Sequence, residues 1–223
     1  YFRLNDEIGV VEWNNPNGRK QPDYMQFEDV LNAAAGDAIS FDFDFRITPV
    51  SGNANGYGFG LIPTTTDGNI SLTHGRGRPD SLIFKLDTYD NGAPHDIEPN
   101  ENHVEITYNG KPDDNSGWLQ TVTPPFNMSD QAWHNFSFEV TKTEGGASLD
   151  VSMTNGASTH LVVDDLTLPG FSFERLYELH VNSGQGAEWS KHDVDNISAE
   201  VTGTTSNDYG DAPAPYPVTS AEN

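Results

Sequence analysis

The chain has 223 residues and a formal net charge of −23, because 34 acidic side chains outnumber 11 lysines and arginines. A chain this acidic repels nucleic acid and anionic lipid, so we expect neither nucleic acid nor membrane insertion among its interactions. It contains no cysteine, which excludes disulfide bonds, and no apolar run approaches the ~20 residues of a membrane span.

Alternating apolar and polar residues predict β-strands along most of the chain. Residues 41–47 place phenylalanines on one face and charges on the other, which is typical of a half-buried strand. Residues 136–140 and 149–153 repeat the pattern around a Glu-Gly-Gly turn signal. Further strands are expected at 56–62, 81–87, 103–108, 160–163, 177–182 and 195–201, and one short helical turn within 26–35.

Many short strands separated by Gly, Pro, Asn and Asp predict an all-β fold, a two-sheet antiparallel sandwich or jelly roll. We assign residues 1–202 to this domain and expect residues 8–13 to pair with 195–201. Residues 203–223 are Pro-rich, lack alternation and predict a linker to a following domain. The Asp-Tyr-Gly-Asp-Ala-Pro run within them resembles junctions in large bacterial surface and secreted multidomain proteins. With no initiating Met and no signal-like segment, we expect an extracellular or cell-surface piece of a longer chain, with neighbouring domains as partners.

Oxygen-bearing side chains crowd the segment after the expected strand at 81–87, namely Asp87, Asp90, Asn91, Asp96 and Glu98. Ca²⁺ prefers six to eight oxygen ligands at about 2.3–2.6 Å, and a strand that delivers carboxylates and a carboxamide into one turn suits it. The alternative is an Asp/Asn-rich turn whose side chains hydrogen-bond their own backbone.

The same segment resembles the metal loop of legume (L-type) lectins, whose pattern is Glu-x-Asp-x-Tyr/Phe-x-Asn followed by Asp-Pro-x-x-x-His. Here it runs Lys-Leu-Asp-Thr-Tyr-Asp-Asn and later Glu-Pro-Asn-Glu-Asn-His. Residues 54–63 and 179–194 are similar to two other loops of that family. The strand that Trp opens at 133–140 is similar to one in concanavalin A-like and laminin G-like domains. The four stretches keep the family's chain order, so the resemblance implies a concanavalin A-like jelly roll over most of residues 56–201.

The resemblance implies a Ca²⁺ site formed by Asp87, the Tyr89 backbone oxygen, Asn91 and Glu98, with Asp96 as an alternative to Glu98. The family also binds a transition metal through the leading Glu, which is Lys85 in this chain. An ammonium group cannot ligate a metal. We therefore expect the second metal to be absent, Lys85 to neutralise Asp87, and His103 to act as a hydrogen-bonding loop residue.

The family's sugar site maps onto Asn55, the neighbourhood of Gly75 and Gly77, and Asn91, with Tyr89 as a further contact. Asn55 stands where the family has Asp and lacks the charge that strengthens hydrogen bonds to sugar hydroxyls. The adjacent arginines predict a clamp for a carboxylate or sulfate of an anionic sugar; the alternative is that they balance nearby acids. The predicted sugar-binding residues are Asn55, Gly75, Arg76, Gly77, Arg78, Asn91, Gly184 and Gln185.

The sequence does not predict an enzyme. Retaining glycoside hydrolysis needs two carboxyl groups about 5–5.5 Å apart, and the Glu-x-Asp-x-x-Glu motif of the related glucanases is absent from the sequence. Asp42 and Asp44 fit the solvent face of an ordinary strand, and His134 and His180 are expected on strands without a nearby nucleophile. Three tryptophans are candidate platforms for stacking on a sugar: Trp13, Trp118 and Trp189. Trp133 is expected to begin a core strand.

The leading hypothesis is therefore a non-catalytic, Ca²⁺-dependent carbohydrate-binding or adhesion module. A polysaccharide-active enzyme on the same fold is one alternative. A structural spacer or protein-binding domain with a degenerate sugar site is another, because one fold hosts all three functions.

Overall fold

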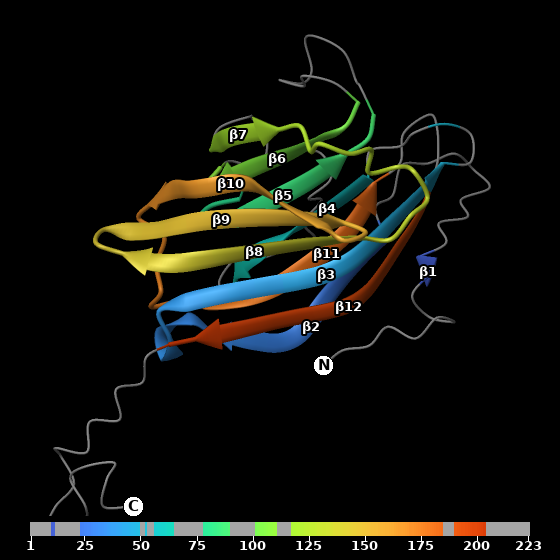
Figure 1. Cartoon of the computed structure of the whole chain (residues 1–223). Coiled ribbons are helices and arrows are strands. Elements are labelled where there is room, and N and C mark those ends of the chain that lie inside the picture. The colour runs from blue at the N-terminus through green and yellow to red at the C-terminus, as the bar shows by residue number, and fades with distance from the viewer. Residues whose placement is uncertain are drawn as a thin grey trace, which may run out of the picture.

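The computed structural model describes residues 10–11, 23–49, 52, 56–64, 78–89, 101–110, 117–184 and 190–203. These residues form strands and one 3₁₀ turn (Figure 1). In chain order they are β1 (Val10–Val11), β2 (Asp23–Asn32), η1 (Ala33–Ala35), β3 (Ala38–Pro49), β4 (Gly56–Pro63), β5 (Leu82–Asp87), β6 (His103–Tyr108), β7 (Trp118–Val122), β8 (His134–Thr143), β9 (Gly146–Asn155), β10 (Ser158–Pro169), β11 (Leu176–Gly184) and β12 (Ser190–Thr202).

The strands form two antiparallel sheets that pack face to face, as Figure 1 shows. Sheet I has the order β1-β12-β3-β8-β9-β10, and sheet II has the order β2-β11-β4-β5-β6-β7. Strands that are distant in the sequence lie side by side, for example β12 beside β3 and β11 beside β4. The predicted two-sheet antiparallel sandwich is confirmed.

Phenylalanine rings fill the space between the sheets. On β3 the residues alternate between the core and the outer face, so that Phe41, Phe43 and Phe45 are buried. The ring of Phe43 meets that of Phe59 on β4 edge-on at 4.9 Å, and Phe59 stacks on Phe84 of β5 at 5.2 Å. Each ring buried in this way contributes roughly 1.5–3 kcal/mol relative to exposure, which makes the core the main source of stability.

Sheet II is buried on both faces along β4 and β5. Leu82, Phe84 and Leu86 face the main core, and the alternate residues of β5 point to the other side of the sheet. On that side Ile62 and Ile83 form a second, small apolar cluster. Charged side chains that share this face are therefore withdrawn from water and need polar partners.

The expected short helical turn within residues 26–35 is confirmed at Ala33–Ala35, and the structure adds two strands, β2 and β7, that the pattern did not reveal. Residues 26–32 belong to β2, and only Ala33–Ala35 are helical. The physical reason is that β2 gains a ladder of hydrogen bonds to β11, which outweighs a weak helical preference. β7 was also missed, because its sequence Trp-Leu-Gln-Thr-Val has no regular alternation of apolar and polar residues and its burial does not alternate either.

The expected pairing of the chain ends is confirmed for the strands but not for the register. β1 pairs with β12 at Val10↔Asp193 and Val11↔His192, before the bulge that separates Asp195 from Ser198. Among the described residues no helix is long and apolar enough to cross a membrane. β12 ends at Thr202, and the linker expected beyond it lies outside the described residues apart from position 203, so that boundary stays a prediction.

Candidate functional site

Several strands end or begin at one end of the sandwich. Gly184, the last residue of β11, pairs with Gly56, the first residue of β4. Asp87, the last residue of β5, lies opposite His103, the first residue of β6. The structure therefore brings together three of the segments that resemble lectin loops. Their other predicted members, Asn55, Asn91, Asp96, Glu98 and Gln185, lie outside the described residues, as does Asp90.

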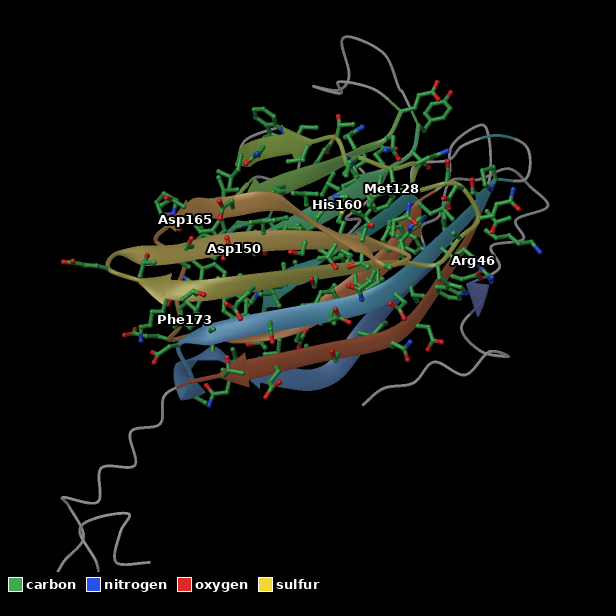
Figure 2. The ribbon with its side chains drawn as sticks, viewed as in Figure 1. Arg46, Met128, Asp150, His160, Asp165 and Phe173 are labelled. Atoms are coloured by element: carbon green, nitrogen blue, oxygen red, sulfur yellow. The ribbon has the colours of Figure 1, made fainter. Side chains whose placement is uncertain are left out.

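At the same end, Tyr57 on β4 of sheet II makes hydrogen bonds to two strands of sheet I. The Tyr57 hydroxyl lies 2.6 Å from the carbonyl oxygen of Asp193 on β12 and 3.0 Å from that of Arg46 on β3. Figure 2 shows Arg46 and Phe173 toward opposite ends of the sandwich. Arg46 in turn donates from Nε to the Asp193 carboxylate at 2.7 Å. The two sheets are thus tied to each other beside the candidate site.

A compact group of charged side chains occupies the outer face of sheet II at this end. The Lys85 ammonium forms an ion pair with the Asp87 carboxylate, and its Nζ lies 3.7 Å from Oε1 of Glu105. The Nε2 atom of His103 lies 3.2 Å from the same Glu105 oxygen. The Lys85 side chain is only 4% exposed and that of Asp87 is fully buried. The expectation that Lys85 neutralises Asp87 is confirmed.

Asp87 also orders the start of the loop that follows it. The Tyr89 backbone N–H donates to Oδ1 of Asp87 at 2.9 Å, the hydrogen bond of an Asx turn. A carboxylate offers about four lone-pair sites. The Lys85 ammonium and the Tyr89 N–H are two of the groups that share this carboxylate. The described members of the implied Ca²⁺ site, the Asp87 carboxylate and the Tyr89 backbone carbonyl, offer the oxygen ligands that Ca²⁺ prefers.

The transition metal implied by the resemblance does not fit. Ligand atoms of Asp87, His103 and Glu105 lie within 4.8 Å of one another, a spacing that can hold a metal ion. The Lys85 ammonium, however, contacts Asp87 and lies near Glu105 within this group, and it would repel a cation there. His103 makes the expected hydrogen bond, but from β6 and not from a loop, because it pairs with Asp87 in the sheet.

Glu105 was missed in the sequence. The signal that could have found it is a charged residue between Val104 and Ile106, directly opposite Lys85 in the register of β5 and β6. A buried acid needs a partner, and the only basic residue of β5 is Lys85. Pairing the two expected strands in antiparallel register from Asp87 and His103 would have placed these charges opposite each other.

The arginine-containing loop is described only at Arg78. Its carbonyl accepts the Ser81 N–H at 3.2 Å in the turn that leads into β5. Asp87 ends the same strand, so the length of β5 separates Arg78 from Asp87. The structure does not bring these two predicted residues together. Gly75, Arg76 and Gly77 lie outside the described residues.

Asp42 and Asp44 lie on the outer face of sheet I, as expected for an ordinary strand. The side-chain amide of Asn135 donates to Oδ1 of both, at 3.0 and 3.1 Å. Burial, followed by the charge of Asp44, raises the pKa of Asp42. The shared amide gives this carboxylate pair a structural role in joining β3 to β8.

Two tryptophans present exposed rings. Trp118 on β7 is 38% exposed and its Nε1 donates to Thr121 Oγ1 at 3.0 Å. Trp133 is 42% exposed and precedes β8, so the expectation that it begins a core strand is wrong; His134 is the first buried residue there. The Arg46 guanidinium lies 4.7 Å from the Trp133 ring centroid, which holds that ring at the end of the sandwich that carries the site. Trp13 and Trp189 lie outside the described residues.

His192 is a buried histidine beside the tie between the sheets. Its ring packs on Tyr57 with centroids 4.9 Å apart, and it is 1% exposed. Neither ring nitrogen has a hydrogen-bond partner among the described residues. Burial lowers the pKa of His192 to about 4, so the ring is neutral in the folded protein at neutral pH.

No protein-family model and no curated protein matches the chain. Solved lectin structures do match. Lectin II from Ulex europaeus is 15% identical, with 86% of this chain and 87% of that chain covered and a TM-score of 0.58. The potassium-bound carbohydrate recognition domain of Emp46p is 10% identical, with coverages of 84% and 81% and a TM-score of 0.58. The VIP36 exoplasmic/lumenal domain, solved with Ca²⁺ and Man3GlcNAc, is 13% identical, with coverages of 86% and 81% and a TM-score of 0.56. At these identities the likeness concerns the fold, and the chain has the jelly-roll fold of L-type lectins.

Proposed function

We propose that this protein is a non-catalytic carbohydrate-binding or adhesion module of the lectin type that works outside the cell with Ca²⁺ bound. The observation that carries the proposal is the meeting of Gly56, Asp87 and Gly184 at one end of the sandwich. Each of them borders a segment that resembles a lectin loop. The similar structures are a lectin, a potassium-bound carbohydrate recognition domain and a domain bound to Ca²⁺ and Man3GlcNAc, and this supports the proposal.

In this proposal Ca²⁺ is held by Asp87, the Tyr89 carbonyl, Asn91 and either Glu98 or Asp96. The Asx turn at Asp87 is equally expected from the alternative of a self-capping turn, so the support for Ca²⁺ comes from the place of Asp87 at the end of β5, where the loop that resembles the lectin metal loop begins. A weak site is sufficient outside cells, where Ca²⁺ is plentiful and extracellular modules bind it with a Kd of about 10⁻⁴–10⁻³ M.

The sugar would lie against the same end of the sandwich, hydrogen-bonded by Asn55 and Asn91. Trp133 adds a ring suited to stacking on the apolar face of a sugar. Its pairing with Arg46 supports this role, because a ring already held in place loses little freedom on binding.

A specific observation favours a second candidate, a spacer or protein-binding domain with a degenerate sugar site. Lys85 already neutralises Asp87 within the fold. The carboxylate could therefore serve stability alone, with no ion and no sugar.

Thermal melting after EDTA treatment, with Ca²⁺ then titrated back, separates the two candidates. We expect Ca²⁺ to raise the melting temperature of the wild type and of Glu200→Ala, which removes an exposed acid of sheet I. Asp87→Asn, which keeps an acceptor for Tyr89 but removes the charge, should lose most of the shift. A glycan array with Ca²⁺ present then tests sugar binding. No shift of the wild type at millimolar Ca²⁺ together with an empty array would favour the spacer.

A further inference from the structure

Lys85 is a buried cation surrounded by groups that bind metal ions. Its side chain is 4% exposed and contacts Asp87, which is fully buried, while Glu105 lies 3.7 Å away and is 12% exposed. His103, also fully buried, completes the group through Glu105. Two buried carboxylates without a cation would carry a large desolvation cost, so the site requires a positive charge.

The ligand geometry of a metal site is already present around this charge. Asp87, His103 and Glu105 each offer a ligand atom, and these atoms lie within 4.8 Å of one another. A mixed set of imidazole nitrogen and carboxylate oxygen suits first-row divalent transition metals. The antiparallel pairs Lys85↔Glu105 and Asp87↔His103 fix the four groups on two adjacent strands, so the arrangement does not depend on a loop.

We propose that the Lys85 ammonium takes the place of a transition-metal ion, and that Asp87, His103 and Glu105 form a latent metal site which this one lysine closes. The acid of this chain, Glu105, stands on β6 across the ladder from Lys85, whereas the lectin pattern has its leading acid at position 85. The internal cation keeps Asp87 in place without any bound transition metal. This inference does not rest on sugar binding, and neither a Ca²⁺ shift nor a glycan result would change it.

Titration with Co²⁺ tests the proposal, because ligand-field absorption in the visible range reports an ion held by protein ligands. Lys85→Ala removes the ammonium, and Lys85→Glu adds a fourth ligand. We expect each to bind about one Co²⁺ per chain, with a higher melting temperature when the metal is present. The wild type, Lys85→Arg and the surface control Lys142→Ala should bind none. Adding His103→Ala to Lys85→Glu should abolish the absorption.

Loss of the ammonium leaves the Asp87 and Glu105 carboxylates without their cation, so the metal-free state of each variant is checked for folding by circular dichroism; a variant found unfolded is then titrated with metal. Recovery of the folded state on adding Co²⁺ or Zn²⁺ would then support the latent site. Two results would overturn it. One is stoichiometric Co²⁺ binding by the wild type that His103→Ala removes. The other is a pair of Lys85 variants that, folded or unfolded, take up no metal at millimolar Co²⁺.

Discussion

The Tyr57 hydroxyl donates a 2.6 Å hydrogen bond to the backbone carbonyl of Asp193, and this bond joins the two sheets beside the candidate site. Burial raises the pKa of Tyr57, so the phenol stays a donor throughout the accessible pH range. Tyr57→Phe should lower the free energy of unfolding by about 1–3 kcal/mol, because a buried carbonyl loses its partner. Urea unfolding of the two proteins measures the difference.

Tyr177→Phe is the matched control for this tie. Its hydroxyl donates to the Ser172 carbonyl at 2.9 Å, close to the start of β11 and away from Asp87. We expect it to cost stability without weakening the Ca²⁺ shift, whereas Tyr57→Phe should weaken both. An unchanged free energy of unfolding for Tyr57→Phe would show that the bond does not stabilise the sandwich.

Stability should fall in acid partly because of His192. Its pKa is about 4 in the folded protein against an ordinary value of 6.5, so the unfolded chain binds more protons between these pH values. The contribution is complete above pH 6.5 and is lost as the pH falls toward 4. A shift of this size corresponds to roughly 3 kcal/mol. Burial also lowers the pKa of His180, against the opposing effect of Glu178, and adds in the same direction.

His192→Phe isolates this contribution, because it keeps a ring against Tyr57 and removes the titrating group. The free energies of unfolding of variant and wild type should diverge as the pH falls from 6.5 to 4, with the variant losing less stability. Urea titrations at several pH values measure the divergence. Parallel curves would mean that His192 is protonated equally in the folded and unfolded states.

The two-sheet architecture could be predicted from the sequence because the alternation of apolar and polar residues within a single strand identifies both the strand and its core face. β3 alternates so regularly that its core face was evident from Phe41, Phe43 and Phe45. β2 could not be identified in the same way, since its place depends on pairing with β11, which is remote in the sequence. The prediction for Trp133 failed because it also depends on a residue remote in the sequence. Hydrophobicity predicts a buried ring, but a cation–π contact with Arg46 holds the exposed ring in place.

The sequence predicted only those parts of the candidate site whose residues belong to one contiguous motif. The neutralisation of Asp87 followed from the resemblance to the lectin metal loop, in which Lys85 stands at the leading Glu two residues before Asp87. Glu105 was invisible to that argument, because its role arises from register across β5 and β6. His192 gave no signal either, since burial between the sheets and not a neighbour in the chain lowers its pKa. The ion pairing of Glu105 and the lowered pKa of His192 therefore depend on the three-dimensional fold and cannot be predicted from the local sequence.

Phe59 should be among the most costly core residues to truncate. Its ring contacts Phe136 of sheet I at 4.7 Å and Phe43 at 4.9 Å, and it stacks on Phe84 at 5.2 Å. Phe59→Ala leaves a cavity at the junction of the two sheets and should cost about 3–5 kcal/mol. Leu161→Ala, at a side chain that is 57% exposed, should change stability by less than about 0.5 kcal/mol. Equal losses would contradict a core that depends on these rings.

Asn102 should hold the connection between β7 and β8 against the start of β6. Its side-chain amide donates to the Phe126 carbonyl at 2.7 Å, and its Oδ1 accepts the Met128 N–H at 2.9 Å. Met128 is fully buried beneath this connection. Asn102→Ala removes both hydrogen bonds, so we expect a loss of about 1–3 kcal/mol and faster hydrogen exchange of the Met128 amide.

Asn102→Asp separates the two bonds, since a carboxylate can still accept from Met128 but cannot donate to Phe126. Its loss of stability should lie between those of the wild type and Asn102→Ala, with the Met128 amide still protected. Because Asn102 precedes His103, loosening this connection in Asn102→Ala should also weaken the pairing of His103 with Asp87. Hydrogen exchange of the β6 amides would detect that change. An equally protected Met128 amide in Asn102→Ala would show that packing of Met128, and not Asn102, fixes the connection.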